Sequence, residues 1–75
     1  MRVLLRAYGK PGAKASWRVV RTLAEASAAC RKYIDANDLG ASNWMGGLVM
    51  GDDVTAVATI SYNGRAWNLD GSPLG

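Results

Sequence analysis

The side chains in this sequence that could do chemistry are mostly cationic. Of its nine Lys and Arg residues, eight lie in the first 32 positions, where Glu25 is the only acid. That stretch carries a formal charge of +7, and the remaining 43 residues carry −4. A folded protein with such a split presents a basic surface region, which attracts phosphate groups or an acidic partner. The pattern therefore indicates a kind of partner and no particular reaction.

The side chains of the common catalytic sites are scarce. There is no histidine, which excludes His-based triads, Cys-His pairs and the common zinc-binding patterns. Asp52, Asp53 and Asp70 are predicted to shape turns. The single Cys30 lies on the apolar stripe of a predicted helix, which predicts a buried, inert thiol. We therefore expect no enzymatic activity, no metal and no cofactor.

The glycines and tryptophans each allow two interpretations. Gly46 and Gly47 could belong to a phosphate loop, but no Gly-Lys-Ser/Thr and no helix follow, so a bulge or close backbone packing is favoured. Trp17 and Trp67 could stack on bases, but their alternation with neighbours predicts that both lie on the core face of a sheet. The sequence leaves the exposure of Trp44 open.

Length and composition limit the architecture. The 75 residues have room for one domain with one small core, and 49% hydrophobic and 20% charged residues are ordinary for a globular protein. No apolar run approaches the roughly 20 residues that cross a bilayer, and Arg6 interrupts the first apolar stretch before a signal-peptide core could form. We expect a single cytoplasmic domain over residues 1–75 with no membrane contact, in which residues 71–75 form a frayed tail.

Two strands and a loop are predicted to position most of the cations. Residues 2–8 and 15–21 alternate between apolar and polar side chains, as in half-buried strands, and the basic loop at 9–14 joins them into an antiparallel hairpin. Three arginines are predicted to share the open face of this hairpin: Arg2, Arg6 and Arg18.

A helix should follow the hairpin. Thr22 and Glu25 match a capping box, in which Thr22 accepts from the backbone at Glu25 and the carboxylate reaches back to the cap. Apolar residues then recur every three or four positions, which predicts a helix of about 14 residues. It should end near Asn37, with Gly40 in the left-handed conformation.

Three further strands are predicted at residues 44–50, 54–62 and 65–69. A type I′ turn at Asn63-Gly64 would pair Tyr62 with Arg65 and Ile60 with Trp67 on the core face and leave a mostly small, polar open face. The chain is thus predicted to be an α+β protein, with a single antiparallel sheet of about five strands and one helix packed on one face, in the order ββαβββ.

Two resemblances follow from these segments. Residues 44–49 and 57–67 look like a W-x-G-G-x-V … V-A-x-I-S-Y-N-G-R-x-W pattern of small proteins encoded by bacterial plasmids and phages. More loosely, the element order and the Gly-Arg-Ala-Trp hairpin are similar to small single-sheet anti-CRISPR proteins of phages. That family binds the backbone subunits of a type I Cascade surveillance complex and obstructs target DNA. By this resemblance, Lys10, Lys14 and Arg65 are candidates for contact with a partner or nucleic acid.

We therefore expect a non-catalytic binding protein of a phage or plasmid. The second resemblance makes the leading hypothesis an anti-CRISPR inhibitor that binds a type I Cascade complex. The alternative is weakly specific DNA or RNA binding through the basic sheet face, and a homodimer joined through open faces or an unpaired edge strand is a third hypothesis. The predicted partner-binding residues are Arg2, Arg6, Tyr8, Lys10, Lys14, Arg18 and Arg65.

Overall fold

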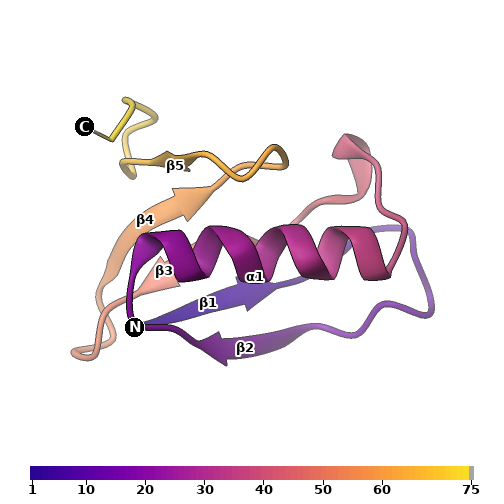
Figure 1. The fold of residues 1–75 in the computed structure, drawn as a ribbon, viewed down its shortest axis with the longest axis horizontal. Helices are drawn as coiled ribbons and strands as arrows, with labels where there is room; N and C mark the ends of the chain where they lie inside the picture. The colour runs from indigo at the N-terminus through magenta and orange to yellow at the C-terminus, as the bar shows by residue number, and fades with distance from the viewer. Residues whose placement is uncertain (75) are drawn as a thin grey trace.

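The computed structural model describes residues 1–74 and has five strands in one antiparallel sheet, with one helix across it (Figure 1). The strands are β1 (Arg2–Leu5), β2 (Ser16–Val19), β3 (Leu48–Met50), β4 (Ala56–Ile60) and β5 (Ala66–Trp67). Their order across the sheet is β2-β1-β3-β4-β5. Helix α1 (Leu23–Ala36) precedes a short 3-10 helix, η1 (Ala41–Asn43). The predicted α+β fold is confirmed.

The core lies between α1 and the side of the sheet that faces it. Val3 on β1, Val49 on β3 and Ala58 on β4 lie side by side in the register and are at most 1% exposed. The helix contributes Ala26, Cys30 and Ile34 from its apolar stripe, as the spacing predicts. No helix among the described residues covers the opposite side of the sheet, and none is long and apolar enough to cross a membrane.

The ends of α1 follow local chemistry closely. Thr22 Oγ1 accepts from the Glu25 backbone N–H at 3.1 Å, which confirms the predicted cap, although Glu25 Oε1 accepts from the Arg21 N–H at 3.4 Å rather than from Thr22. At the other end Asp38, with φ of 53°, takes the left-handed position predicted for Gly40, whose φ is −90°. Aspartate tolerates this conformation. The helix ends at Ala36 with Asn37 as its cap, close to the predicted end, and the N–H of Leu39 donates to the carbonyl of Ile34 at 3.0 Å.

The register of the last hairpin differs from the prediction by one residue. Ile60 pairs with Ala66, and Thr59 pairs with Trp67. Of the residues in this hairpin loop, only Gly64 has a positive φ (89°), whereas a type I′ turn needs two. The Gly64 N–H donates to the Ser61 carbonyl at 2.9 Å and the Ser61 N–H to the Arg65 carbonyl at 2.9 Å, so the loop has three residues. Because side chains alternate along a strand, this shift exchanges the two faces of β5. The predicted pairs Tyr62–Arg65 and Ile60–Trp67 are therefore wrong.

Three other segments depart from their predicted form. Trp44 makes only an isolated bridge to Ala7, so β3 begins at Leu48. Val54 has a φ of 64°, which is incompatible with a strand, and β4 begins at Ala56. The segment after β5, predicted to fray, turns back so that Trp67 and Pro73 form a bridge; Gly75 lies outside the described residues.

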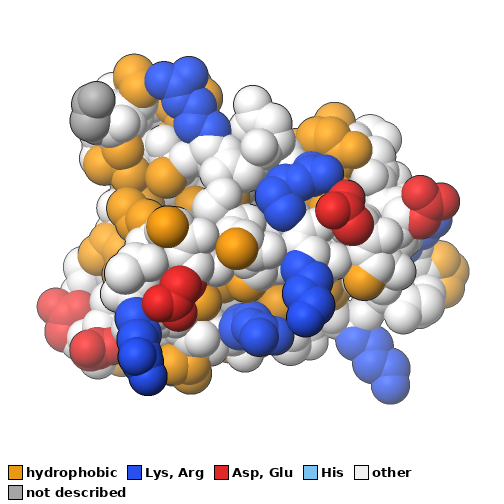
Figure 2. Space-filling model, viewed as in Figure 1, with side chains coloured by type: hydrophobic (Ala, Val, Ile, Leu, Met, Phe, Trp, Pro, Cys, Tyr) orange, Lys and Arg blue, Asp and Glu red, His pale blue; other side chains and the backbone are white. Residues whose placement is uncertain are grey.

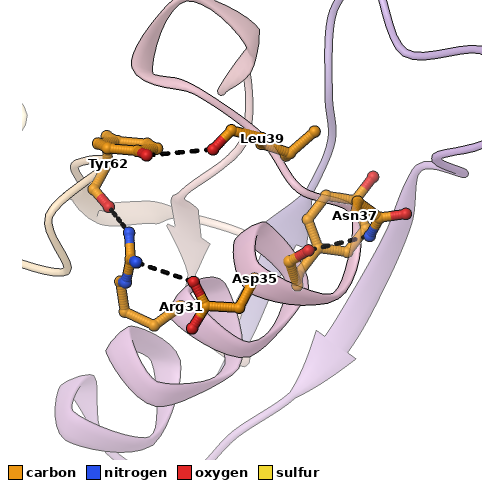
Figure 3. Close-up of polar contacts among 6 residues, drawn as sticks. Arg31, Asp35, Asn37, Leu39 and Tyr62 are labelled. Carbon is orange, nitrogen blue, oxygen red and sulfur yellow. Dashed lines mark hydrogen bonds and ion pairs between the residues drawn. The ribbon is translucent and has the colours of Figure 1, made fainter.

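Arg31 connects the helix to the last hairpin loop (Figure 3). Its guanidinium donates to the Tyr62 carbonyl at 2.5 Å and to Asp35 Oδ1 at 3.0 Å, and it lies 5.2 Å from the centroid of the Tyr62 ring. The Tyr62 hydroxyl in turn donates to the Leu39 carbonyl at 3.1 Å. Arg31 therefore belongs to a structural contact between α1 and the turn after β4.

Replacing Arg31 with alanine should lower the free energy of unfolding by about 2 kcal/mol, because a charge-assisted hydrogen bond to a partly buried carbonyl and a cation–π contact are lost. Chemical denaturation measures the change. The matched control is Lys32→Ala, which removes an exposed cation from the next helical position and should change stability by less than about 0.5 kcal/mol. Equal effects of the two substitutions would contradict a structural role for Arg31.

Candidate binding surface

The side of the sheet turned away from α1 is the candidate functional surface, and we call it the open face. Its residues alternate along each strand with buried core residues. Two cross-strand rows run over it, Val19–Arg2–Met50 and Leu48–Thr59–Trp67, with Leu4 opposite Trp17. The open face consists of Arg2, Leu4, Arg6, Trp17, Val19, Leu48, Met50, Val57, Thr59, Arg65 and Trp67.

Two arginine–tryptophan pairs flank the apolar centre of the open face. The Arg2 guanidinium carbon lies 5.3 Å from the centroid of the Trp17 ring, and that of Arg65 lies 4.5 Å from the Trp67 ring. Each distance is within the range of a cation–π contact. The Trp67 indole N–H also donates to Ser61 Oγ at 3.1 Å, which fixes the ring orientation. The pairs lie on β1–β2 and on the last hairpin, at opposite sides of the sheet.

The prediction that Trp17 and Trp67 lie on the core face of the sheet is wrong. Trp17 is 45% exposed and pairs with Leu4, on the side away from the helix, and Trp67 pairs with Thr59 on that same side. In β2 the alternation is as predicted, but the faces are reversed, because Val20 and not Trp17 enters the core. The open face is consequently more apolar and aromatic than a small, polar sheet surface.

The charge of the open face is positive. None of the five strands contains an acidic residue, and the ion pairs of the described residues are Met1–Asp52 and Arg31–Asp35, which leave the open-face arginines unpaired with acids. Asp52 lines a hollow with Arg2 and Val19, but the N-terminal ammonium donates to its carboxylate at 2.8 Å. This hydrogen bond and the ammonium charge lower the pKa of Asp52. It therefore remains ionised and directed at Met1.

The seven predicted contact residues are divided among three places. Arg2, Arg6 and Arg65 lie on the open face. Arg18 does not, because it pairs with the buried Val3 and therefore points to the helix side of β2; this corrects the prediction that three arginines of the first hairpin share one face. The remaining three lie in or beside the first loop: Tyr8, Lys10 and Lys14.

Tyr8 is 69% exposed, and its backbone is held by Asn43 of η1. The Tyr8 N–H donates to the Asn43 carbonyl at 2.7 Å, and Asn43 Nδ2 donates to the Tyr8 carbonyl at 3.0 Å. Lys10 lies farther along the same loop. The backbone of Tyr8 is thus fixed to η1, whereas the Lys10 carbonyl accepts from the Ala13 N–H at 3.0 Å within the loop itself.

The sequence patterns did not place Trp17, Val19 and Trp67 on the open face. A usable signal was present in the spacing of Arg65 and Trp67, since residues two apart in a strand share a face. An arginine is almost never buried without a partner, so the face of Arg65 had to be the solvent side, and Trp67 with it.

The conspicuous Trp-x-Gly-Gly segment has a structural explanation. The Trp44 indole N–H donates to the Ile60 carbonyl at 3.0 Å. The Gly47 backbone is bonded to the chain on either side of it: its N–H donates to the Leu4 carbonyl at 2.7 Å, and its carbonyl accepts from the Ile60 N–H at 2.8 Å. Gly47 is buried with a φ of 98°. The predicted bulge or close backbone packing is thus present where the chain enters β3.

Cys30 lies on the inward stripe of α1, as predicted, and its exposed fraction is 0%. Burial raises the pKa of its thiol from 9.0 to about 12. The thiol is therefore neutral at physiological pH, whereas the nucleophilic form of cysteine is the thiolate.

This shift predicts how stability depends on alkaline pH. Because folding raises the pKa of the Cys30 thiol, the folded state holds this proton more tightly than the unfolded chain does. The contribution of the thiol to the free energy of unfolding is therefore complete below the unfolded pKa of 9.0 and is lost as the pH rises toward about 12. The free energy of unfolding should fall by about 1.4 kcal/mol between pH 8 and pH 10 because of this thiol. Urea denaturation of the native chain and of Cys30→Ala measures it. A loss of the same size in Cys30→Ala would contradict the assignment to Cys30.

Among residues 1–74, no three His, Cys, Asp or Glu side chains are grouped so that they could hold a metal ion. The arrangement of the open face instead offers flat contact area and guanidinium donors. In comparisons, no family model, curated protein or solved structure matches the chain. The open face is therefore the feature of the molecule from which a function can be inferred.

Proposed function

We propose that this chain is a non-catalytic binding protein that docks its open face onto a protein or nucleoprotein complex. One observation carries the proposal: two tryptophans, each paired with an arginine, flank an apolar centre that no helix of the described chain covers. Tryptophan and arginine are the side chains most enriched at the energetic centres of protein interfaces. Exposed apolar patches on small proteins commonly mark such interfaces.

The centre of the open face favours a protein surface over a phosphate backbone. Leu4, Leu48 and Met50 are half-buried, and Val57 is 44% exposed, so these side chains gain from being removed from water. The flanking guanidinium groups are held over their tryptophan rings and still present N–H donors to carboxylates or carbonyls of a partner. An apolar centre with a polar, cationic margin matches the usual anatomy of a protein interface.

Nucleic-acid binding remains the second candidate, because Arg2, Arg6 and Arg65 have no acidic partner on the open face. Salt dependence separates the two. If three arginines neutralise three phosphates of a single strand, the logarithm of the binding constant should fall with the logarithm of salt concentration with a slope of about −2. Docking through an apolar centre should give a shallower slope. A labelled oligonucleotide and the purified chain suffice for this measurement.

The resemblance to single-sheet anti-CRISPR proteins suggests the backbone subunits of a type I Cascade complex as the partner. In this proposal the protein acts in the bacterial cytoplasm and obstructs binding of target DNA. The test is a DNA-binding assay with purified Cascade and a labelled target duplex. We expect saturating protein to prevent duplex binding while binding naked duplex weakly. Undiminished duplex binding by Cascade would reject this partner, and tight binding of the naked duplex would favour the nucleic-acid candidate.

A further inference from the structure

A second feature of the molecule is the unpaired outer edge of β2, a strand whose Trp17 and Val19 side chains also belong to the open face. All four residues of β2 are exposed, and β1 is its only partner strand within residues 1–74. At the opposite edge of the sheet, Trp67 of the two-residue strand β5 forms a bridge with Pro73. Among residues 1–74, the outer edge of β2 is therefore the longer unpaired edge.

The hydrogen-bonding groups on this edge can be assigned from the register. The Val20 N–H donates to the Met1 carbonyl at 2.9 Å, and β1 and β2 pair without a shift from Arg2–Val19 to Leu5–Ser16. In an antiparallel pair the backbone groups of alternate residues point toward the partner. Since Val20 points toward β1, Trp17 and Val19 point their N–H and C=O groups outward. These four groups can accept an additional strand.

A shallow hollow of about 240 Å³ lies beside this edge, between β2 and α1. Val20, Ala28 and Ala29 supply its apolar lining, and Arg18 and Lys32 supply cations. Glu25 also lines it, but its carboxylate accepts from the Arg21 backbone N–H. Small side chains on the helix thus leave room for the side chains of an added strand.

The cations around this hollow extend along the whole edge. Lys14 precedes β2, and the Tyr33 hydroxyl holds its carbonyl against the helix at 3.0 Å. Arg21 follows β2 and is exposed. Figure 2, which faces the helix side, shows basic side chains in a row along the side of the molecule where β2 lies. Four cations, Lys14, Arg18, Arg21 and Lys32, therefore surround the edge, against one acid.

We propose that the β2 edge binds an extended, acidic peptide segment of a partner protein by strand addition. A strand paired with β2 would direct alternate side chains to the hollow, where Arg18 and Lys32 favour carboxylates. The intervening side chains would lie beside Trp17 and Val19, the latter 82% exposed, and should be apolar. The recognised sequence thus alternates between acidic and apolar residues.

A second copy of the chain fits this edge poorly. Two β2 strands related by a two-fold axis would bring both sets of cations to one seam, and like charges on neighbouring strands oppose pairing. None of the five strands contains an acid that could offset this charge. Charge complementarity therefore favours an acidic partner.

The test is a titration of isotope-labelled protein with a capped Asp-Val-Asp-Val-Asp-Val peptide, followed by NMR. We expect amide shifts along β2 and at Lys32, and at least a tenfold loss of affinity when every second peptide nitrogen is methylated. Val19→Pro, which removes an outward N–H that the fold does not use, should have the same effect. Lys32→Gln should weaken binding at least threefold, whereas Ser42→Asp, with the same change in net charge on exposed η1, should not.

Several outcomes overturn the proposal. They are absence of binding, equal affinity for the methylated peptide, and unchanged affinity of both edge variants. Tighter binding of an oligonucleotide of equal charge at the same residues would assign the edge to nucleic acid. Concentration-dependent shifts of Trp17 and Val19 without peptide would assign it to a second copy. These outcomes concern the backbone groups of Trp17 and Val19 at the edge, whereas the open face is tested through the side chains of Trp17 and Trp67.

Discussion

Alanine at position 47 is expected to remove most of the stability of this protein. A Cβ on Gly47 would lie 2.1 Å from the Ile60 carbonyl oxygen, and the backbone φ of 98° is unfavourable for any residue with a side chain. Backbone strain and the collision together should lower the free energy of unfolding by about 4 kcal/mol or more. A small domain has a total of about 5 kcal/mol at the low end of the usual range, so little would remain.

The collision has a second consequence, because the Ile60 carbonyl also accepts from the Trp44 indole at 3.0 Å. Displacing that carbonyl would loosen the packing of Trp44 on Tyr33, whose ring centroid lies 6.1 Å away. Gly71→Ala is the matched control: its φ is 87°, but no atom lies within 4 Å of the added Cβ. It should cost about 1–2 kcal/mol. Similar denaturation midpoints for Gly47→Ala and Gly71→Ala would contradict the claim that the close packing of Gly47 against the Ile60 carbonyl stabilises the fold.

The largest expected effect on binding comes from removing both open-face tryptophans. Trp17→Ala with Trp67→Ala should weaken affinity for the partner complex at least 100-fold, or about 3 kcal/mol, because central aromatic side chains supply much of the energy of an interface. The substitutions also remove the aromatic rings over which the guanidinium groups of Arg2 and Arg65 are held. Competition binding with Cascade, the proposed partner, measures the loss of affinity, and circular dichroism establishes that the variant is folded.

The third tryptophan provides the control for that experiment. Trp44→Phe keeps an aromatic ring in the core but loses the hydrogen bond to Ile60, so it should lower stability and leave affinity within about twofold. The double Trp→Phe variant at positions 17 and 67 should recover much of the affinity, since an aromatic surface is retained. Full affinity in the double alanine variant would mean that the partner binds elsewhere.

Local patterns in the sequence predicted the elements well. The Thr22 cap and the apolar spacing of α1 gave a helix of the observed 14 residues, and Cys30 lies inside the core as its position indicates. Such features depend on residues close in sequence, and short-range hydrogen bonds and periodicity determine them. The number and antiparallel pairing of the strands followed from alternation and turn residues in the same way.

The composition of the open face could not be obtained by the same reasoning. The Asn63-Gly64 pair is compatible with loops of two or three residues, and the choice changes the register by one and moves Trp67 to the other face. Alternation shows which residues of β2 share a face, but tertiary packing decides which face meets the helix. On the helix side of β2, the small side chains of Ala28 and Ala29 leave a hollow that Arg18 lines. Val20 is the residue of this side that enters the core, and Trp17 lies on the opposite face.

The indole N–H signals of the three tryptophans, followed by NMR as the partner complex is added, test the central claim most directly. The open face contains Trp17 and Trp67, whereas Trp44 packs against the core, so one spectrum carries two probes and an internal reference. We predict that the Trp17 and Trp67 signals shift or broaden first, at substoichiometric partner, while that of Trp44 keeps its position. Binding that leaves both open-face indoles unchanged would contradict the proposal that the open face contacts the partner.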